Sequence, residues 1–235
     1  MRKIYYIFLF LCVLTSFFAS AKEVKKVQES PKTFTVMLDP AGDAQNTGRQ
    51  IDDYLERGIT LQFCQKLKKE LEQEFDNIRV VLTRFPGESI AHLQNANFAN
   101  RLDVDFYLSI HFYKEKSVKP RVYIFTFAYQ DDFITHKPDL YFYPYDKLHL
   151  INRGKTKKCV ELIKNVFLSD EYTKFFDLKH ILGLPFKPLI AVTAPAVGVE
   201  IGLKKRDDWR GYCRVFVDCI GSVVSHQRGA HELGG

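Results

Sequence analysis

The chain has 235 residues, of which 46% are hydrophobic and 26% are charged. This length and composition fit one packed domain and exclude a mainly disordered chain. The formal net charge is +6 at neutral pH. No basic stripe of the kind that binds nucleic acid stands out, so we expect no nucleic-acid partner.

The first 21 residues have the pattern of a secretory signal peptide. Arg2 and Lys3 precede a mostly apolar run, Ile4–Phe18, and Ala19-Ser20-Ala21 has the small-x-small form that a signal peptidase accepts. The apolar run is short for a membrane span. We therefore predict a cleaved signal peptide at residues 1–21 and an exported protein, in the periplasm, the extracellular space or the cell wall. An uncleaved N-terminal anchor is the alternative.

A polar stretch at residues 22–32 predicts a linker, followed by a domain at residues 33–228. The domain opens with a nearly continuous apolar strand, Phe34–Leu38, of the kind that is covered on both faces. The turn after this strand brings Asp39, Pro40, Gly42 and Asp43 together at its carboxyl end.

The middle of the domain alternates helices with strands. Apolar residues recur every four positions from Ile59 to Phe75 and predict an amphipathic helix that opens near Glu56. A helix is also predicted over residues 90–102. Strands are predicted at residues 78–84, 105–112 and 121–127. The second of these carries His111 next to its carboxyl end.

The C-terminal third begins with an aromatic segment, Pro138–Leu150, which we predict to be a covering loop or hairpin. Its rings either pad the edge of the core or stack on sugar faces. A helix is expected at residues 152–168, strands at 188–192 and 196–202, and a closing helix at 209–225. Residues 229–235 read as a flexible tail.

These elements predict a single α/β domain with a mostly parallel or mixed central sheet flanked by helices. Polar residues at the carboxyl ends of different strands converge on one crevice in such sheets. That rule gathers Asp39, Asp43, His111 and Glu200, with Glu56 at the start of the long helix.

Imidazole and carboxylate are the donors of a catalytic zinc site, which uses three protein ligands and leaves one position open. A further carboxylate can serve as a general base, which together gives amide hydrolysis. The alternative without catalysis is an exported α/β domain in which these strand-end residues are structural.

Four cysteines follow the signal peptide, namely Cys64, Cys159, Cys213 and Cys219. Their spacing is not that of a CxxC metal or redox motif. Cys64 and Cys159 lie among apolar residues of predicted helices, so we expect buried thiols. Export would permit disulfides, and the sequence leaves the pairing open.

Five motifs occur in an order that resembles one known family. They are LDPAGDAQNTG (38–48), LERGITL (55–61), VVLTR (80–84), ANRLDVDFYLSIHFY (99–113) and PAVGVEIGL (195–203). The order and spacing resemble the zinc-dependent N-acetylmuramoyl-L-alanine amidases, cell-wall hydrolases of the AmiA/AmiC and CwlV type. The likeness runs from about residue 33 to residue 225.

The resemblance implies roles for matching positions only. Glu56 and His111 would be Zn²⁺ ligands and Glu200 the general base, while Arg84 would be structural or face the substrate. It implies a secreted, monomeric amidase that acts on peptidoglycan, and it leaves room for an activating or gating protein partner.

Three departures from the family pattern stand out. Gly42 occupies the position of the family's first zinc-binding histidine, Tyr113 replaces an asparagine, and Asn95 replaces an arginine. Asp43 is the nearest substitute ligand, and His92 or His180 are other candidates. Without a third ligand the alternative is a catalytically degenerate pseudo-amidase that binds peptidoglycan or a protein partner.

Overall fold

The computed structural model describes residues 33–91, 93–129 and 144–232. The expected signal peptide and linker, His92, residues 138–143 of the aromatic segment and residues 233–235 lie outside this part of the chain. Contacts divide the chain into Met1–Lys32 and Thr33–Gly235, and everything described below belongs to the second unit.

A six-stranded sheet in the order β4-β1-β5-β8-β6-β7 forms the centre of this unit. Four strands are parallel: β4 (Ile78–Leu82), β1 (Phe34–Pro40), β5 (Phe106–Lys114) and β8 (Ala196–Leu203). β6 (Arg121–Phe127) runs antiparallel to β8, and β7 (Asp177–Leu184) runs parallel to β6. The prediction of an α/β domain with a parallel or mixed sheet is therefore confirmed.

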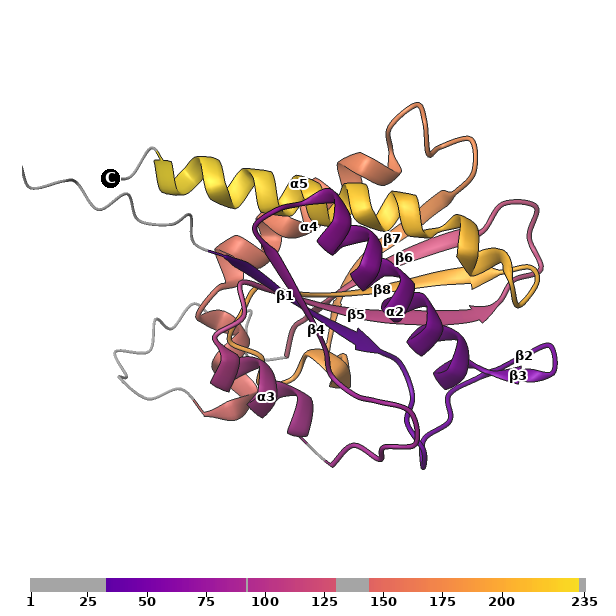
Figure 1. Cartoon of the computed structure of the whole chain (residues 1–235), viewed down its shortest axis with the longest axis horizontal. Coiled ribbons are helices and arrows are strands. Elements are labelled where there is room, and N and C mark those ends of the chain that lie inside the picture. The colour runs from indigo at the N-terminus through magenta and orange to yellow at the C-terminus, as the bar shows by residue number, and fades with distance from the viewer. Residues whose placement is uncertain (1–32, 92, 130–143, 233–235) are drawn as a thin grey trace, which may run out of the picture. The chain divides into compact units, whose positions relative to one another are not determined.

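Helices cover the two faces of the sheet unequally. α2 (Glu56–Glu74), α4 (Arg153–Phe167) and α5 (Cys213–Glu232) lie on one side, and α3 (Gln94–Leu102) lies on the other (Figure 1). The first three helices share one large core cluster with the sheet. α3 contributes only Ala96 and Ala99 to a smaller cluster on its side. This second face is therefore the thinly covered one.

The apolar residues whose spacing predicted α2 form its buried face. Ile59, Phe63, Leu67 and Leu71 are all buried, because residues four apart fall on one face of a helix. Phe63 packs edge-on against Phe112, with ring centroids 5.2 Å apart. α2 therefore joins the centre of the sheet to the C-terminal helix.

Two predictions about strands were wrong. Residues 188–192 form no strand, because Pro188 lacks a backbone N–H and lies within a short 3₁₀ helix, η3 (Lys187–Leu189). β7 was missed because it is an edge strand whose side chains are largely exposed, so neither an apolar run nor an alternation marks it. The hairpin β2–β3 (Gln50–Ile51 and Tyr54–Leu55) also had no sequence signal.

Other elements differ mainly at their ends. α3 begins four residues later than predicted. A 3₁₀ turn, η4 (Asp208–Gly211), precedes α5, and α5 then continues to Glu232, into the stretch expected to be a tail. The described end of the aromatic segment is a third 3₁₀ helix, η2 (Tyr145–Leu150). No helix among the described residues is both long and apolar enough to cross a bilayer.

All four described cysteines are free and buried. Burial raises the pKa of the Cys159 and Cys213 thiols to about 12, and it also raises the pKa of Cys64 and Cys219. Thiols at these pKa values stay protonated and poorly nucleophilic. The expectation of buried thiols at Cys64 and Cys159 is confirmed.

Replacing Phe63 by alanine tests the packing of α2 on the sheet. We expect the free energy of unfolding to fall by about 3–5 kcal/mol, because a large buried ring leaves a cavity. Urea denaturation measures the change. Phe175→Ala is the matched control, since Phe175 is 62% exposed, and it should shift stability by no more than about 0.5 kcal/mol. A loss below about 1 kcal/mol for Phe63→Ala would contradict this packing.

Candidate functional site

The strand register brings four polar residues together at one end of the sheet. Asp39 on β1 lies opposite Ser109 on β5, and His111 on β5 lies opposite Glu200 on β8. Because side chains alternate along a strand, all four point to the face that carries Met37 and Tyr107, which belong to the smaller core cluster. The thinly covered face of the sheet therefore holds the candidate site.

A chain of hydrogen bonds fixes the ring of His111. Ser109 Oγ donates to Asp39 Oδ2 at 2.9 Å, and the same hydroxyl lies 3.1 Å from His111 Nε2. The other ring nitrogen, Nδ1, is 3.5 Å from Glu56 Oε1. Asp39 and Ser109 are buried, so little water competes for these contacts.

The direction of these bonds decides which ring nitrogen can bind a cation. A serine hydroxyl has one proton, and Ser109 Oγ donates it to Asp39 Oδ2. Ser109 then accepts from Nε2–H of His111, which leaves Nδ1 facing Glu56. Nδ1 and Glu56 Oε1, 3.5 Å apart, are thus the two atoms of this arrangement that could share a cation.

Burial also acts on Asp39 itself. It raises the pKa of this carboxyl above its ordinary value, although hydrogen bonds from Thr83 and Ser109 and the charge of His111 oppose the shift. Thr83 Oγ1 and Asn95 Nδ2 each donate to Asp39 Oδ1 at 2.8 Å. Asn95, one of the departures from the family pattern, thus holds Asp39 in place.

Glu56 is held by backbone N–H groups at the start of α2. Its Oε1 accepts from Phe112 N and its Oε2 from Arg49 N, each at 3.0 Å. Burial alone would raise its pKa, but His111 and these two N–H groups lower it on balance. Gly48 makes room for the carboxylate, since a Cβ at this position, where φ is +73°, would lie 2.7 Å from Oε2. Glu56 is therefore an ionised, preorganised acceptor.

Glu200 forms an ion pair with Arg49. Arg49 Nη1 lies 2.9 Å from Glu200 Oε1, and the Glu200 side chain is 15% exposed. The same guanidinium approaches Phe112 O at 3.4 Å. The Arg49 side chain is 50% exposed, so solvent screens this pair and the contribution to stability is small. Arg49 thus covers Glu200 with a contact that is easily broken.

Asp43 has a structural environment. Its Oδ1 accepts from Gln45 N at 2.7 Å and from Asn46 N at 2.6 Å, while its Oδ2 accepts from Ile90 N at 3.2 Å and from the Asn46 side chain. Partial burial opposes the effect, but these hydrogen bonds lower the pKa of Asp43. The expected substitute ligand is occupied in holding its own turn.

Within the part of the chain that the structure describes, no group of three His, Cys, Asp or Glu side chains is placed to hold a metal. The structure therefore brings His111 and Glu56 together without Asp43. Gly42 has a φ of +76°, and a Cβ there would lie 2.9 Å from Arg57 Cβ. The backbone at the family's histidine position is thus unsuited to a side chain.

The other candidate ligands fall elsewhere. His180 on β7 pairs with Tyr123, which pairs with Glu200 in turn. His180 is thus three strands from His111, roughly 14 Å at the usual strand spacing. His92 lies outside the described residues. Neither supplies a described third donor.

Arg84 holds the turn beneath the site. It is buried and donates to the backbone oxygens of Pro40, Ala41 and Arg57 at 3.2, 3.1 and 2.8 Å. Burial lowers its pKa from the ordinary arginine value. Of the two roles that the sequence left open for Arg84, these contacts favour the structural one.

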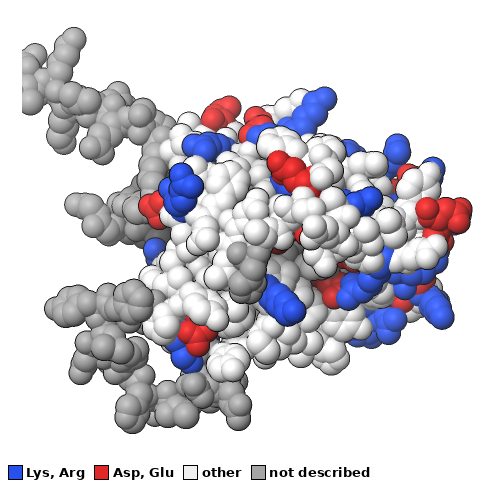
Figure 2. All heavy atoms as spheres, turned by 90° about the horizontal axis from the view of Figure 1, so that it is seen from below, with Lys and Arg blue, Asp and Glu red and all other residues white. Residues whose placement is uncertain are grey.

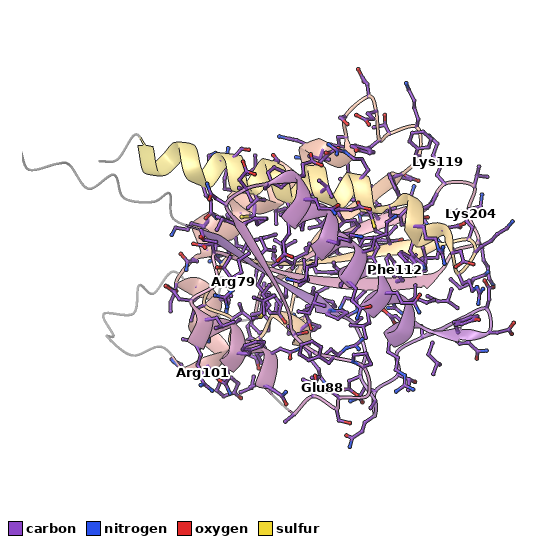
Figure 3. The ribbon with its side chains drawn as sticks, in the orientation of Figure 1. Arg79, Glu88, Arg101, Phe112, Lys119 and Lys204 are labelled. Carbon is purple, nitrogen blue, oxygen red and sulfur yellow. The ribbon has the colours of Figure 1, made fainter. Side chains whose placement is uncertain are left out.

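A cavity of ≈ 440 Å³ opens beside His111. Its lining includes Asp39, Gly42, Asp43, His111 and Lys187, whereas Glu56 and Glu200 are not part of it. The ring of Phe186 lies 5.0 Å from that of His111. Pro188 and Ile190, from the segment 188–192 that forms no strand, also line this cavity. Phe112, which is labelled in Figure 3, donates its backbone N–H to the Glu56 carboxylate.

Sequence reasoning missed two residues of this arrangement. Ser109 stands two positions before His111 in the SIH motif, so the period of a strand could have placed it on the same face. Arg49 follows Gly48 in a loop, and no sequence signal connects it with Glu200.

The profile of the N-acetylmuramoyl-L-alanine amidase family matches residues 36–208. The chain belongs to this family. It is 32% identical over 76 residues to the amidase CwlM of Bacillus licheniformis, a match that covers 32% of this chain and 30% of that protein. The matched segment thus spans less than a third of that relative's length.

Solved amidase structures share the fold. The catalytic domain of CwlV from Bacillus (Paenibacillus) polymyxa var. colistinus has a TM-score of 0.59 at 18% identity, over 82% of this chain and 99% of that one. AmiC2 of Nostoc punctiforme has a TM-score of 0.57 at 16% identity, over 83% and 97% of the two chains. At these identities the likeness establishes the fold.

Replacing Asp43 by alanine tests its structural role. We expect a loss of about 1–3 kcal/mol in the free energy of unfolding at pH 7, because partly buried N–H groups lose their acceptor. The pKa of Asp43 is lowered by folding, so its contribution is complete above the unfolded value of about 3.9 and is lost as the pH falls through the folded value. The gap between wild type and variant should therefore narrow at about pH 3.

Urea denaturation at the two pH values measures this gap, with the exposed Asp53→Ala as control. Equal stability of the Asp43→Ala variant and the wild type at pH 7 would contradict the structural role.

Proposed function

We propose that this protein is an amidase that hydrolyses the bond between the muramoyl lactyl carbonyl and L-alanine in peptidoglycan. Family membership supports the reaction class. The observation that carries the proposal is the pairing of His111 Nδ1 with Glu56 Oε1 at 3.5 Å, one strand away from Glu200. A purely structural site would have no need of a second carboxylate beside that pair.

We propose Zn²⁺ as the cation between Glu56 and His111. Two ligands of one tetrahedral zinc, each about 2.0–2.2 Å from the ion, lie about 3.3–3.5 Å apart, which the observed separation fits. Glu56 and His111 would supply two protein ligands, one fewer than a usual catalytic zinc site has. Water or substrate oxygen would complete the coordination where the family has a histidine and this chain has Gly42. When bound, zinc would polarise the lactyl carbonyl and lower the pKa of water.

The protein's own residues supply the remaining steps of the proposal. Glu200 accepts a proton from the attacking water and delivers it to the amine of L-alanine as the C–N bond breaks. Arg49 has to leave Glu200 Oε1 for that carboxylate to act, and the exposure of Arg49 permits this movement. Asp39 and Ser109 keep Nδ1 of His111 directed at Glu56 throughout.

We further propose that the protein works outside the cytoplasm, where peptidoglycan lies. The support is the N-terminal sequence, with its basic start, apolar run and Ala19-Ser20-Ala21. The domain bounds 33–228, and a protein partner that gates the site, remain predictions.

Glu200→Gln is the first test of the activity. The variant should lose at least about a hundredfold in the rate of cell-wall digestion, because general base catalysis contributes about 10²–10⁴. Its zinc content should stay at the wild-type level, about one ion per chain, because Glu200 is not a proposed ligand. His111→Ala should lose both zinc and activity. Metal analysis and release of free stem peptides are the two measurements.

Wild-type protein that binds no zinc when zinc is supplied, and that releases no stem peptide, would overturn this function. Binding to insoluble wall that survives EDTA and is unchanged in His111→Ala would then establish the pseudo-amidase alternative. Equal digestion by Glu200→Gln and wild type would instead remove Glu200 from the reaction.

A further inference from the structure

A second cavity lies beside the candidate site, along the edge of the sheet. It measures ≈ 720 Å³ and is lined by β4, the loop after it and α3. Ala91 belongs to the linings of both this groove and the cavity at His111. The two spaces are therefore neighbours, and a polymer that enters one can continue into the other.

Two aromatic rings line this second cavity, called the groove below, and neither is buried in the hydrophobic core. Phe85 is 65% exposed and Phe98 is 37% exposed. On α3 the buried positions are Ala96 and Ala99, so the helix buries its small residues and presents its one aromatic ring to the groove. An amphipathic helix packed only for stability would do the reverse.

The loop that carries Phe85 is tied to the candidate site. Glu88 accepts a hydrogen bond from Phe85 N through Oε2 at 2.6 Å, which fixes the turn. Glu88 O accepts from Ala44 N at 2.9 Å, and Ile90 N donates to the Asp43 carboxylate. The ring is thus presented at a fixed place relative to His111.

Polar groups of the kind that bind sugar hydroxyls surround the rings. Gln94, Asn97, Glu88 and Arg101 all line the groove. Figure 3 labels Glu88 and Arg101 on the same side of the domain, away from Lys119 and Lys204. Most of the surface seen in Figure 2, which views the side that carries α3, is uncharged. This setting suits a largely neutral chain with hydroxyl and amide groups.

An extended peptide fits the groove less well than a saccharide. β4 is an edge strand, and an added peptide strand would need its outward backbone groups. Val80 N already donates to Glu72 Oε1 at 3.1 Å, and Val80 O accepts from Lys68 Nζ. Side chains of α2 therefore block the edge at the middle of β4.

We propose that this groove binds the glycan strand of peptidoglycan, with Phe85 and Phe98 stacking on sugar faces. The proposal rests on the proposed function and adds to it the part of the substrate beyond the scissile amide. The attached peptide then enters the neighbouring cavity at His111.

Binding of peptide-free glycan strands tests this assignment by calorimetry. The wild-type protein is the parent, because peptide-free glycan has no amide bond that the proposed activity could cut. Adding Phe85→Ala and Phe98→Ala together should weaken binding at least tenfold, whereas Phe85→Trp with Phe98→Tyr should restore most of it. Phe175→Ala, which removes a ring elsewhere that is about as exposed as that of Phe85, should bind as the parent does.

The assignment is overturned if the double alanine variant is folded by circular dichroism and binds glycan like the parent. It is also overturned if free stem peptides, rather than glycan, bind in a way that depends on the two rings. EDTA should leave glycan binding unchanged. Ring-dependent glycan binding by a protein without amidase activity would keep this inference and remove the proposed function, so the two failures are distinguishable.

Discussion

One line of hydrogen bonds, from Asp39 through Ser109 and His111 to Glu56, determines what the rest of this site can do. It joins two parallel strands to the first residue of α2. Ser109 gives its single proton to Asp39, so it accepts from Nε2–H of His111 and fixes the orientation of the ring. Nδ1 then faces the Glu56 carboxylate, which two backbone N–H groups already hold. The polar partners are buried, so the arrangement is built by folding and needs no substrate to form.

The unequal covering of the sheet explains why this line is accessible. Three helices pack on one face, whereas α3 and the segment around η3 cover only part of the other. The carboxyl ends of β1 and β5 therefore line the cavity at His111, beside loops that Arg84 and Asp43 brace. The buried Arg84 and the turn around Asp43 thus make the cavity walls rigid. The contact free to move is the ion pair of Glu200 with the exposed Arg49.

The sequence predicted α2 from its apolar period and β5 from its nearly continuous apolar run. The register of β5 with β8 then places His111 beside Glu200. It could not predict β7, whose side chains are mostly exposed. It could not separate the two roles open to Asp43, because an aspartate that caps a turn and an aspartate that binds a metal look alike in a one-dimensional pattern. Ser109 and Arg49 act through contacts between distant segments, which no local spacing reports.

Anomalous diffraction at the zinc edge, from crystals of the full chain grown with Zn²⁺, tests the central claim most directly. The account predicts a single strong peak between His111 Nδ1 and Glu56 Oε1, about 2.0–2.2 Å from each atom, with the Nε2 contact to Ser109 retained. A map with no peak at this position, and with His111 bonded directly to Glu56 in the presence of zinc, would contradict it.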